Sequence, residues 1–185
     1  PALFRISESK MNLIRSTQGK SMKDLMVKTA LLLTFLLSMG ARADVPFEIE
    51  VVDKFDEPWS ISTMPDGRFL VTEKKGMLLI VKQDGERSLR VGGIPSVGYW
   101  GQGGMGDAIA HPDFNDNKMI YVSYVEAGVG DTRGAAVARG VLDESGRRPV
   151  LNDVEVIWRQ YPKQVGYGHY GHRLAFDEDG YLWIS

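Results

Sequence analysis

The chain has 185 residues and a formal net charge of -2, so it lacks the excess of basic side chains that is typical of nucleic-acid-binding proteins. It contains no cysteine, which excludes a disulfide scaffold, a thiolate metal site and cysteine catalysis. A hydrophobic fraction of 43% is enough for a packed core, and the 21 glycines favour many turns over long helices.

The first part of the chain has the pattern of an export signal. A mildly basic stretch, 22–28, precedes an apolar run, 29–39, and Ala41-Arg42-Ala43 then fits the small-x-small cleavage rule. The apolar run is about half of the ~20 residues that a membrane-spanning helix needs. We therefore expect a periplasmic or secreted protein with no stable membrane anchor.

This pattern also sets the expected domain organisation. Residues 1–21 precede a plausible start at Met22 (or Met26) and are interpreted as upstream or artefactual sequence. Residues 22–43 are the expected signal peptide, and 44–185 the mature region.

A strand–turn–strand unit recurs three times in the mature region. The three units span 59–73, 107–123 and 172–185, and the first and last turn at Asp66-Gly67 and Asp179-Gly180. We expect Asp and Gly to form tight hairpin turns in which both residues tolerate positive φ. Further strand-like stretches lie between the units, at 76–81, 135–142 and 154–158.

This repetition predicts an all-β protein built of consecutive antiparallel meanders, with no helix longer than about two turns. The turns recur at spacings of roughly 45 and 65 residues, in the range of β-propeller blades with one loop insertion. A β-sandwich is the alternative, and the repeated hairpins favour the propeller. Three units would not close a propeller and the sequence stops within a strand, so we expect a truncated chain that holds about the first half of the propeller.

Three segments resemble ligand-binding motifs, but the residues around each one exclude that interpretation. The glycine-rich run 101–106 resembles a phosphate loop, but a strand ending in proline follows it where a helix is needed. The run 113–117 begins like a calcium loop, but Lys118 stands where that loop needs glycine. His169 and His172 could suggest zinc, with His111 as a distant third ligand. Because residues three apart point to opposite faces of an extended segment, we assign no metal ligand.

His169 remains as the candidate catalytic base. It lies in a glycine-rich segment, Gly166 to Gly171, which leaves room for a ligand above the imidazole. Histidine titrates near neutral pH, so it can take a proton from a substrate hydroxyl. From the residues alone, a structural histidine is the alternative interpretation.

Three blocks, in order, resemble the soluble quinoprotein glucose and sorbosone dehydrogenases, a family that includes periplasmic aldose sugar dehydrogenases. The first is Pro58-Trp59-Ser60-Ile61 with 64–73, the second is 101–105 with 111–114, and the third is His169-x-x-x-Arg173-Leu174 with 179–181. Together they cover nearly all of the mature region.

The resemblance implies a six-bladed β-propeller with pyrroloquinoline quinone (PQQ) on its axis, together with calcium. It implies an oxidoreductase that oxidises an aldose sugar at its anomeric carbon and passes the electrons to an external acceptor. His169 would remove the hydroxyl proton while hydride passes to the quinone, Gln102 would face the substrate, and Arg173 is taken as structural. The residues that bind the cofactor and calcium are expected downstream of Ser185, so the chain alone is expected to be inactive.

The third block departs from the family pattern at Gly168, where some members carry a polar group, and at His172, where a small residue is common. Two alternative functions stay open: a metal-dependent propeller lactonase, and a sugar-binding propeller in which His169 only orders a loop.

Overall fold

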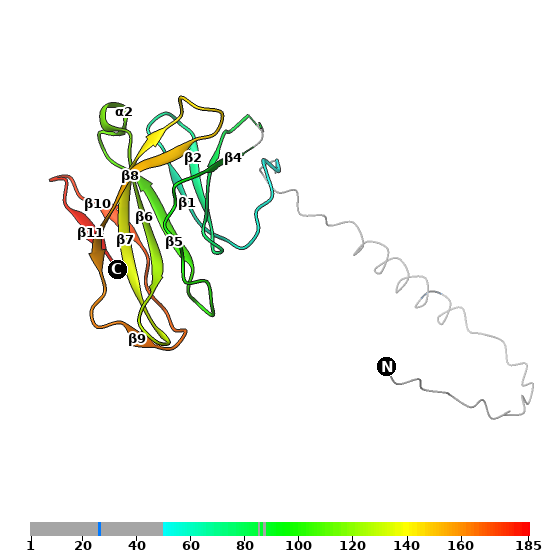
Figure 1. Ribbon diagram of the computed structural model, residues 1–185. Helices are drawn as coiled ribbons and strands as arrows, with labels where there is room; N and C mark the ends of the chain where they lie inside the picture. Colours follow the sequence, from blue (N-terminus) through cyan, green and yellow to red (C-terminus); the bar gives the residue numbers. More distant parts are fainter. Residues whose placement is uncertain (1–25, 27–49, 85, 87) are drawn as a thin grey trace, which may run out of the picture. The chain divides into compact units, whose positions relative to one another are not determined.

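Three antiparallel sheets make up the part of the chain that the structure, a computed structural model, describes: residues 26, 50–84, 86 and 88–185 (Figure 1). Residues 50–185 form one compact unit. Apart from Met26, the expected signal peptide and the segment before it lie outside the described residues. Within the described part, no helix is long and apolar enough to cross a membrane.

The first sheet is a four-stranded meander in sequence order. Its strands are β1 (Pro58–Thr63), β2 (Phe69–Glu73), β3 (Met77–Val81) and β4 (Leu89–Val91). In the turn between β1 and β2, the N–H of Gly67 donates to the carbonyl of Met64 (2.9 Å), and Gly67 has φ 86°.

The second sheet has five strands, of which four form another meander. These are β5 (Met105–Ala110), β6 (Met119–Ala127), β7 (Thr132–Asp143) and β8 (Val150–Arg159), while the short β9 (Gln164–Val165) pairs with the start of β7. A single helical turn, α2 (Phe114–Asn117), lies between β5 and β6. The third sheet is the hairpin of β10 (Leu174–Phe176) and β11 (Leu182–Ile184).

Strand β6 shows how the second sheet packs on both faces. Ile120 and Val122 lie in the core shared with Leu70 and Leu78 of the first sheet, whereas Tyr121 lies in a core with Leu174 of the third. Successive side chains of a strand point to opposite faces, so the alternation along β6 supplies both cores. Each sheet thus packs face to face on the next in chain order, as consecutive propeller blades do.

The all-β prediction is confirmed, including the meanders and the absence of any long helix among the described residues. Both Asp-Gly hairpins are present, but their loops span five residues, and within each Asp-Gly pair only the glycine has positive φ. One local expectation was wrong. The third unit begins at Leu174 rather than at His172, because Gly171 (φ 70°) and His172 (φ 77°) interrupt the extended backbone.

Candidate active site

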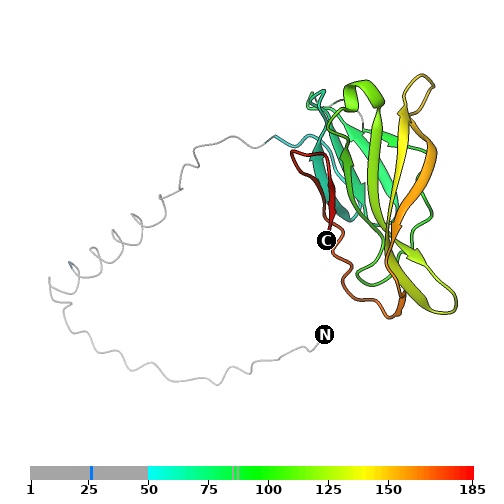
Figure 2. The ribbon, with the colours of Figure 1, turned by 90° about the vertical axis from the view of Figure 1, so that its left-hand side faces the viewer.

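Two loops bring the predicted site residues to the same end of the second sheet (Figures 1 and 2). Gln102 lies in the loop between β4 and β5, and His169 lies in the segment between β9 and β10. The backbone N–H of Gln102 donates to the carbonyl of Tyr167 at 3.1 Å, two residues before His169. Both side chains are exposed, so the structure joins the backbones of the two segments and leaves the amide and the imidazole open to solvent.

The glycines of the first loop allow it to approach other parts of the protein closely. A Cβ at Gly101 (φ 53°) would lie 2.5 Å from the Cβ of Tyr167, and a Cβ at Gly104 (φ 139°) would lie 2.2 Å from the carbonyl oxygen of Lys74. Neither contact is sterically possible for a larger residue. The glycines at these two positions therefore allow the loop to approach other segments of the chain itself.

Aromatic and basic side chains surround the junction of the two loops. The rings of Trp100 and Tyr167 lie 6.0 Å apart between centroids, and the guanidinium of Arg133 lies 4.8 Å from the Tyr167 ring centroid. The ammonium of Lys74 donates to the carbonyl of Gly101. The carbonyl of Lys74 in turn accepts the N–H of Met105 at 2.9 Å, so the loop is fixed at both ends.

A buried aspartate connects the strand that follows Gln102 with the strand that follows His169. Asp107 accepts the N–H of Ala108 with Oδ1 (3.0 Å) and the N–H of Leu174 with Oδ2 (3.0 Å). The Nε of Arg173 lies 3.6 Å from the same Oδ2, and the rest of this side chain is mostly exposed. This ion pair is consistent with the structural role expected for Arg173.

His172 is buried between β1 of the first sheet, β5 of the second sheet and the segment that connects β9 to β10. Its side chain contacts Trp59 of β1 and Tyr170, with ring centroids 6.1 and 5.8 Å away. Burial lowers the pKa of His172 to about 4, against a smaller opposing effect of Asp107, so the imidazole is neutral at neutral pH. His169 and His172 thus differ in environment, since His169 is exposed and His172 is buried.

His111 lies among other side chains and completes a turn instead of joining the other histidines. Its Nδ1 accepts the N–H of Asp113 at 3.0 Å and is 2.9 Å from the Nδ2 of Asn117, and its ring stacks on Tyr121 at 6.0 Å. Among the described residues, no group of three or more His, Cys, Asp or Glu side chains could hold a metal ion.

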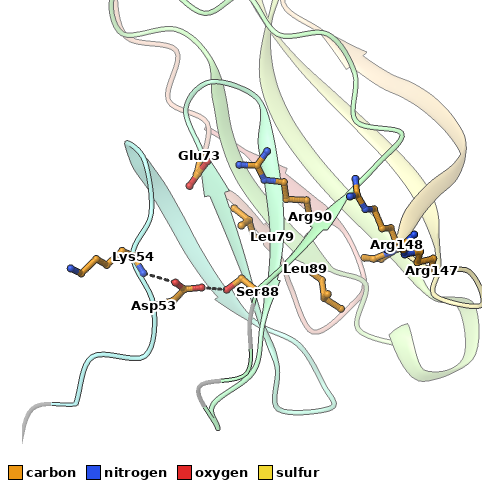
Figure 3. A pocket seen from close by; sticks show the side chains of 10 residues that line it. Asp53, Lys54, Glu73, Leu79, Ser88, Leu89, Arg90, Arg147 and Arg148 are labelled. Carbon is orange, nitrogen blue, oxygen red and sulfur yellow. Dashed lines mark hydrogen bonds between the residues drawn. The ribbon is translucent and has the colours of Figure 1, made fainter.

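A cavity of about 610 Å³ lies elsewhere, at the first sheet (Figure 3). Glu73, Leu79 and Arg90 of the sheet line it, together with side chains of the segment between β7 and β8. It contains no histidine, and neither Gln102 nor His169 lines it. Size alone does not identify the site, so we place the site at the two joined loops, where the candidate base lies. The residues lining the cavity are Asp53, Lys54, Glu73, Leu79, Ser88, Leu89, Arg90, Arg147, Arg148 and Pro149.

Sequence reasoning missed the buried polar residues that support the two loops. Thr72 donates to the carbonyl of Gly106 (2.6 Å), and Ser123 donates to the carbonyl of His172 (2.7 Å) and accepts the N–H of Asp107 (2.8 Å). The available signal was a polar residue at a position where a strand facing two cores should be apolar. Asp107 and Ser123 both interrupt otherwise apolar stretches of β5 and β6 in this way.

Comparisons with known proteins show which family the described part of the chain resembles. The family model described as "Glucose / Sorbosone dehydrogenase" matches residues 55–185. The aldose sugar dehydrogenase YliI of Escherichia coli (strain K12) is 35% identical over 145 residues, which are 77% of this chain and 38% of that protein. The chain therefore spans about two fifths of the length of this relative.

Solved structures of aldose sugar dehydrogenases are similar to this chain in both sequence and fold. The soluble aldose sugar dehydrogenase of Escherichia coli in the apo-form is 36% identical with a TM-score of 0.68, over 75% of this chain and 40% of that one. The PQQ-bound form of the aldose sugar dehydrogenase of Streptomyces coelicolor is 26% identical with a TM-score of 0.62, over 74% of this chain and 40% of that one.

Proposed function

Because the chain belongs to the glucose/sorbosone dehydrogenase family, we propose that it is the amino-terminal part of a PQQ-dependent enzyme that oxidises an aldose at its anomeric carbon. The observation that carries the proposal is the junction at which Gln102 N–H binds the carbonyl of Tyr167, two residues from His169. This junction joins the loop between β4 and β5, which carries an exposed amide, to the segment between β9 and β10, which carries an exposed imidazole. The similarity to aldose sugar dehydrogenases supports the choice of substrate class.

The residues present fit part of a quinone site. PQQ is a flat, polar, anionic ring system, and the junction offers the imidazole of His169, the amide of Gln102 and the exposed ring of Trp100. His169 and Gln102 would lie against the bound cofactor and the sugar. We assign no residue of this chain to calcium, and we place the remaining cofactor contacts downstream of Ser185.

His169 acts as the general base in this proposal. One of its ring nitrogens takes the proton of the sugar's anomeric hydroxyl as the oxygen becomes the carbonyl oxygen of a lactone. PQQ, when bound, would supply the acceptor for the hydride of the same carbon, and an external acceptor would then take up the two electrons. Two of the glycines beside His169 border open space, since a Cβ at Gly166 or Gly168 would meet nothing within 4 Å, and a sugar could enter there. Gly171 does not leave such space, because a Cβ there would lie 2.1 Å from the carbonyl oxygen of Ser185.

Gln102 orients the substrate. An exposed amide can donate to one sugar oxygen and accept from another hydroxyl, which suits a polyol. Its backbone N–H is bound to the carbonyl of Tyr167, so the backbone that carries the amide is held against the His169 segment. Positioning of this kind lowers the entropic cost of reaching the reactive geometry.

The test uses the protein made from the complete reading frame, loaded with PQQ. His169→Asn keeps a polar side chain but cannot take the proton, so we expect turnover with glucose to fall at least about a hundredfold, with quinone loading and thermal stability close to the parent. His111→Asn, which changes a histidine outside the site, should keep turnover within about threefold. Parent turnover in the His169 variant at equal loading would show that this imidazole is structural.

We also propose that the protein is exported to the periplasm or secreted. The support is the sequence of basic, apolar and small residues from Met22 to Ala43, which has the order of a cleavable signal. Amino-terminal sequencing of the protein recovered from outside the cytoplasm should give Asp44 as the first residue. Recovery from a membrane fraction with residues 29–39 still attached would contradict this.

A further inference from the structure

His172 is a buried polar side chain that the proposed chemistry does not use. It is 3% exposed, and neither of its ring nitrogens has a hydrogen-bond partner within the described part of the chain. Its backbone is in the left-handed region (φ 77°), which a residue with a Cβ rarely adopts. Burial of an imidazole without hydrogen bonds lowers the stability of the fold, and so does a strained backbone conformation. Strained residues are concentrated near functional sites.

The imidazole of His172 packs directly on the strand that follows Gln102. A Cβ at Gly106 would lie 2.3 Å from the Cγ and 2.6 Å from the Nδ1 of His172, so the ring rests on bare backbone. On its other sides lie the rings of Trp59, edge to face, and Tyr170. The ring therefore fills the space between strand β5 and the residue next to His169.

Hydrogen bonds also fix the backbone of His172, one within its own segment and one to strand β6. Its N–H donates to the carbonyl of Tyr170 at 2.9 Å, which closes a tight turn directly after His169, and its carbonyl accepts the hydroxyl of Ser123 at 2.7 Å. Ser123 also binds the N–H of Asp107. Ring and backbone together hold the carboxyl end of the His169 segment against β5 and β6.

Resting on the proposed function, we propose that His172 is a positioning residue for His169. Its ring sets how far the His169 segment stands from the Gln102 loop, since Gly106 lies four residues after Gln102 and Tyr170 directly follows His169. The junction at Tyr167 fixes the amino side of the segment, and His172 fixes the carboxyl side. A shift of about 1 Å in a catalytic group can cost a hundredfold in rate, so loss of this contact should lower turnover without removing the base.

Two substitutions disturb the contact from opposite sides. His172→Gly removes the ring and suits the left-handed backbone, so the variant should fold. Gly106→Ala keeps the ring but displaces it. In the full-length, PQQ-loaded protein we expect each variant to lower kcat by about ten- to a hundredfold, with the KM for glucose within about threefold of the parent. In the double variant the added methyl group has no ring to displace, so Gly106→Ala should cost little more once His172 is glycine.

A second measurement needs neither cofactor nor sugar. In the apoprotein, amide hydrogen exchange of residues 167–172 should be faster in both single variants than in the parent, with little change in β7. Gly130→Ala is the matched control, because Gly130 is in the same left-handed region (φ 65°) with open space around it. It should change neither kcat nor exchange in 167–172.

The outcomes separate this inference from the proposed function. Parent-like kcat and exchange in His172→Gly would overturn the positioning role, as would additive losses in the double variant. Should His172→Gly not fold, exchange in Gly106→Ala decides the same question. If the parent protein oxidises no aldose, or His169→Asn is fully active, the proposed function fails, while the exchange result still shows whether the ring fixes the segment.

Discussion

Asp107 shows how one buried carboxylate can connect two parts of a site. It is 2% exposed, and its two oxygens accept backbone N–H groups from β5 and β10. Hydrogen bonds to a charged acceptor contribute more than neutral ones, and their loss leaves buried donors unpaired. The residue is therefore important for the stability of the end of the His169 segment.

Replacing Asp107 tests this role. Asp107→Asn turns one accepting oxygen into an amino group that faces a backbone donor, and we expect it to lower the free energy of unfolding by about 2–3 kcal/mol. Asp113→Asn, at an exposed aspartate, is the control and should change it by less than about 0.5 kcal/mol. Urea unfolding of both variants provides the measurement. Equal losses of unfolding free energy would show that the buried hydrogen bonds of Asp107 do not stabilise the fold more than an exposed aspartate does.

His172 makes stability depend on pH in a defined direction. Its pKa falls from 6.5 to about 4 on folding because burial disfavours the charged form. Between these values the unfolded chain binds more protons than the native one, so stability is complete above pH 6.5 and decreases as the pH falls toward 4. A shift of this size corresponds to about 3 kcal/mol.

This dependence can be assigned to His172 by comparison with a variant. Carboxylates also titrate in acid, so the parent is compared with His172→Gly, in which only the imidazole is missing. We expect the unfolding free energy of the parent to decrease more steeply between pH 6.5 and 4 than that of the variant, as measured by urea unfolding. Parallel curves would show that His172 has the same pKa in the folded and unfolded states.

Among the elements, the loop between β4 and β5 depends most on glycine. Gly104 combines φ 139° with a space in which a Cβ would lie 2.2 Å from the carbonyl oxygen of Lys74. That carbonyl accepts the N–H of Met105, so it cannot move away without loss of a hydrogen bond. Backbone strain and steric collision thus act at the same position.

We expect Gly104→Ala to lower the free energy of unfolding by about 3 kcal/mol or more, as strain and clash add. Gly130→Ala meets only the strain of its left-handed backbone and should cost about 1 kcal/mol. Thermal unfolding of the two variants gives the comparison. If Gly104→Ala lowers the free energy of unfolding no more than Gly130→Ala does, the Lys74 carbonyl can move away from the added methyl group at little cost in stability.

The elements could largely be predicted from the sequence, because alternation and turn residues are local signals. The stretches 76–81 and 135–142 both fall within strands of the structure, β3 and β7, apart from Gly76 at the edge. The start of β10 could not be predicted, since a histidine at positive φ is set by its packing on Gly106 rather than by its own preference.

The site was predictable only in part. His169 was identified from its glycine-rich segment and then from the resemblance, and Gln102 from the resemblance. Their separation in the sequence gave no sign that Gln102 N–H would bind the Tyr167 carbonyl. Asp107, Ser123 and His172 act through contacts between sheets, and such contacts depend on the register of strands far apart in the chain. Residues that support a site are therefore harder to find than those with recognisable chemistry.

At the scale of the whole molecule, strand β1 and the third sheet still expose apolar side chains. The centre of the first sheet is packed on both faces, because Val71 and Leu79 lie in a second small core with Phe55. Ile61 of β1 is 60% exposed and Trp183 of β11 is 66% exposed, although both lie in strands. In the described part of the chain, β11 pairs only with β10, so one of its edges has no strand beside it. Open apolar faces and unpaired edges are typical sites of association between chains.

We therefore expect the chain from Asp44 to Ser185, expressed by itself, to bind a hydrophobic dye such as ANS and to form oligomers as its concentration rises. The protein from the complete reading frame should do neither, because the further sheets that we propose would cover these exposed side chains. Trp183→Lys places a charge on one exposed face and should reduce the association of the shorter chain, whereas Val129→Lys, at a loop residue that is 94% exposed, should not. Analytical ultracentrifugation with dye fluorescence measures both effects. A monomeric, non-binding shorter chain would mean that its end sheets are stable in water, and that closing the propeller contributes little to their stability.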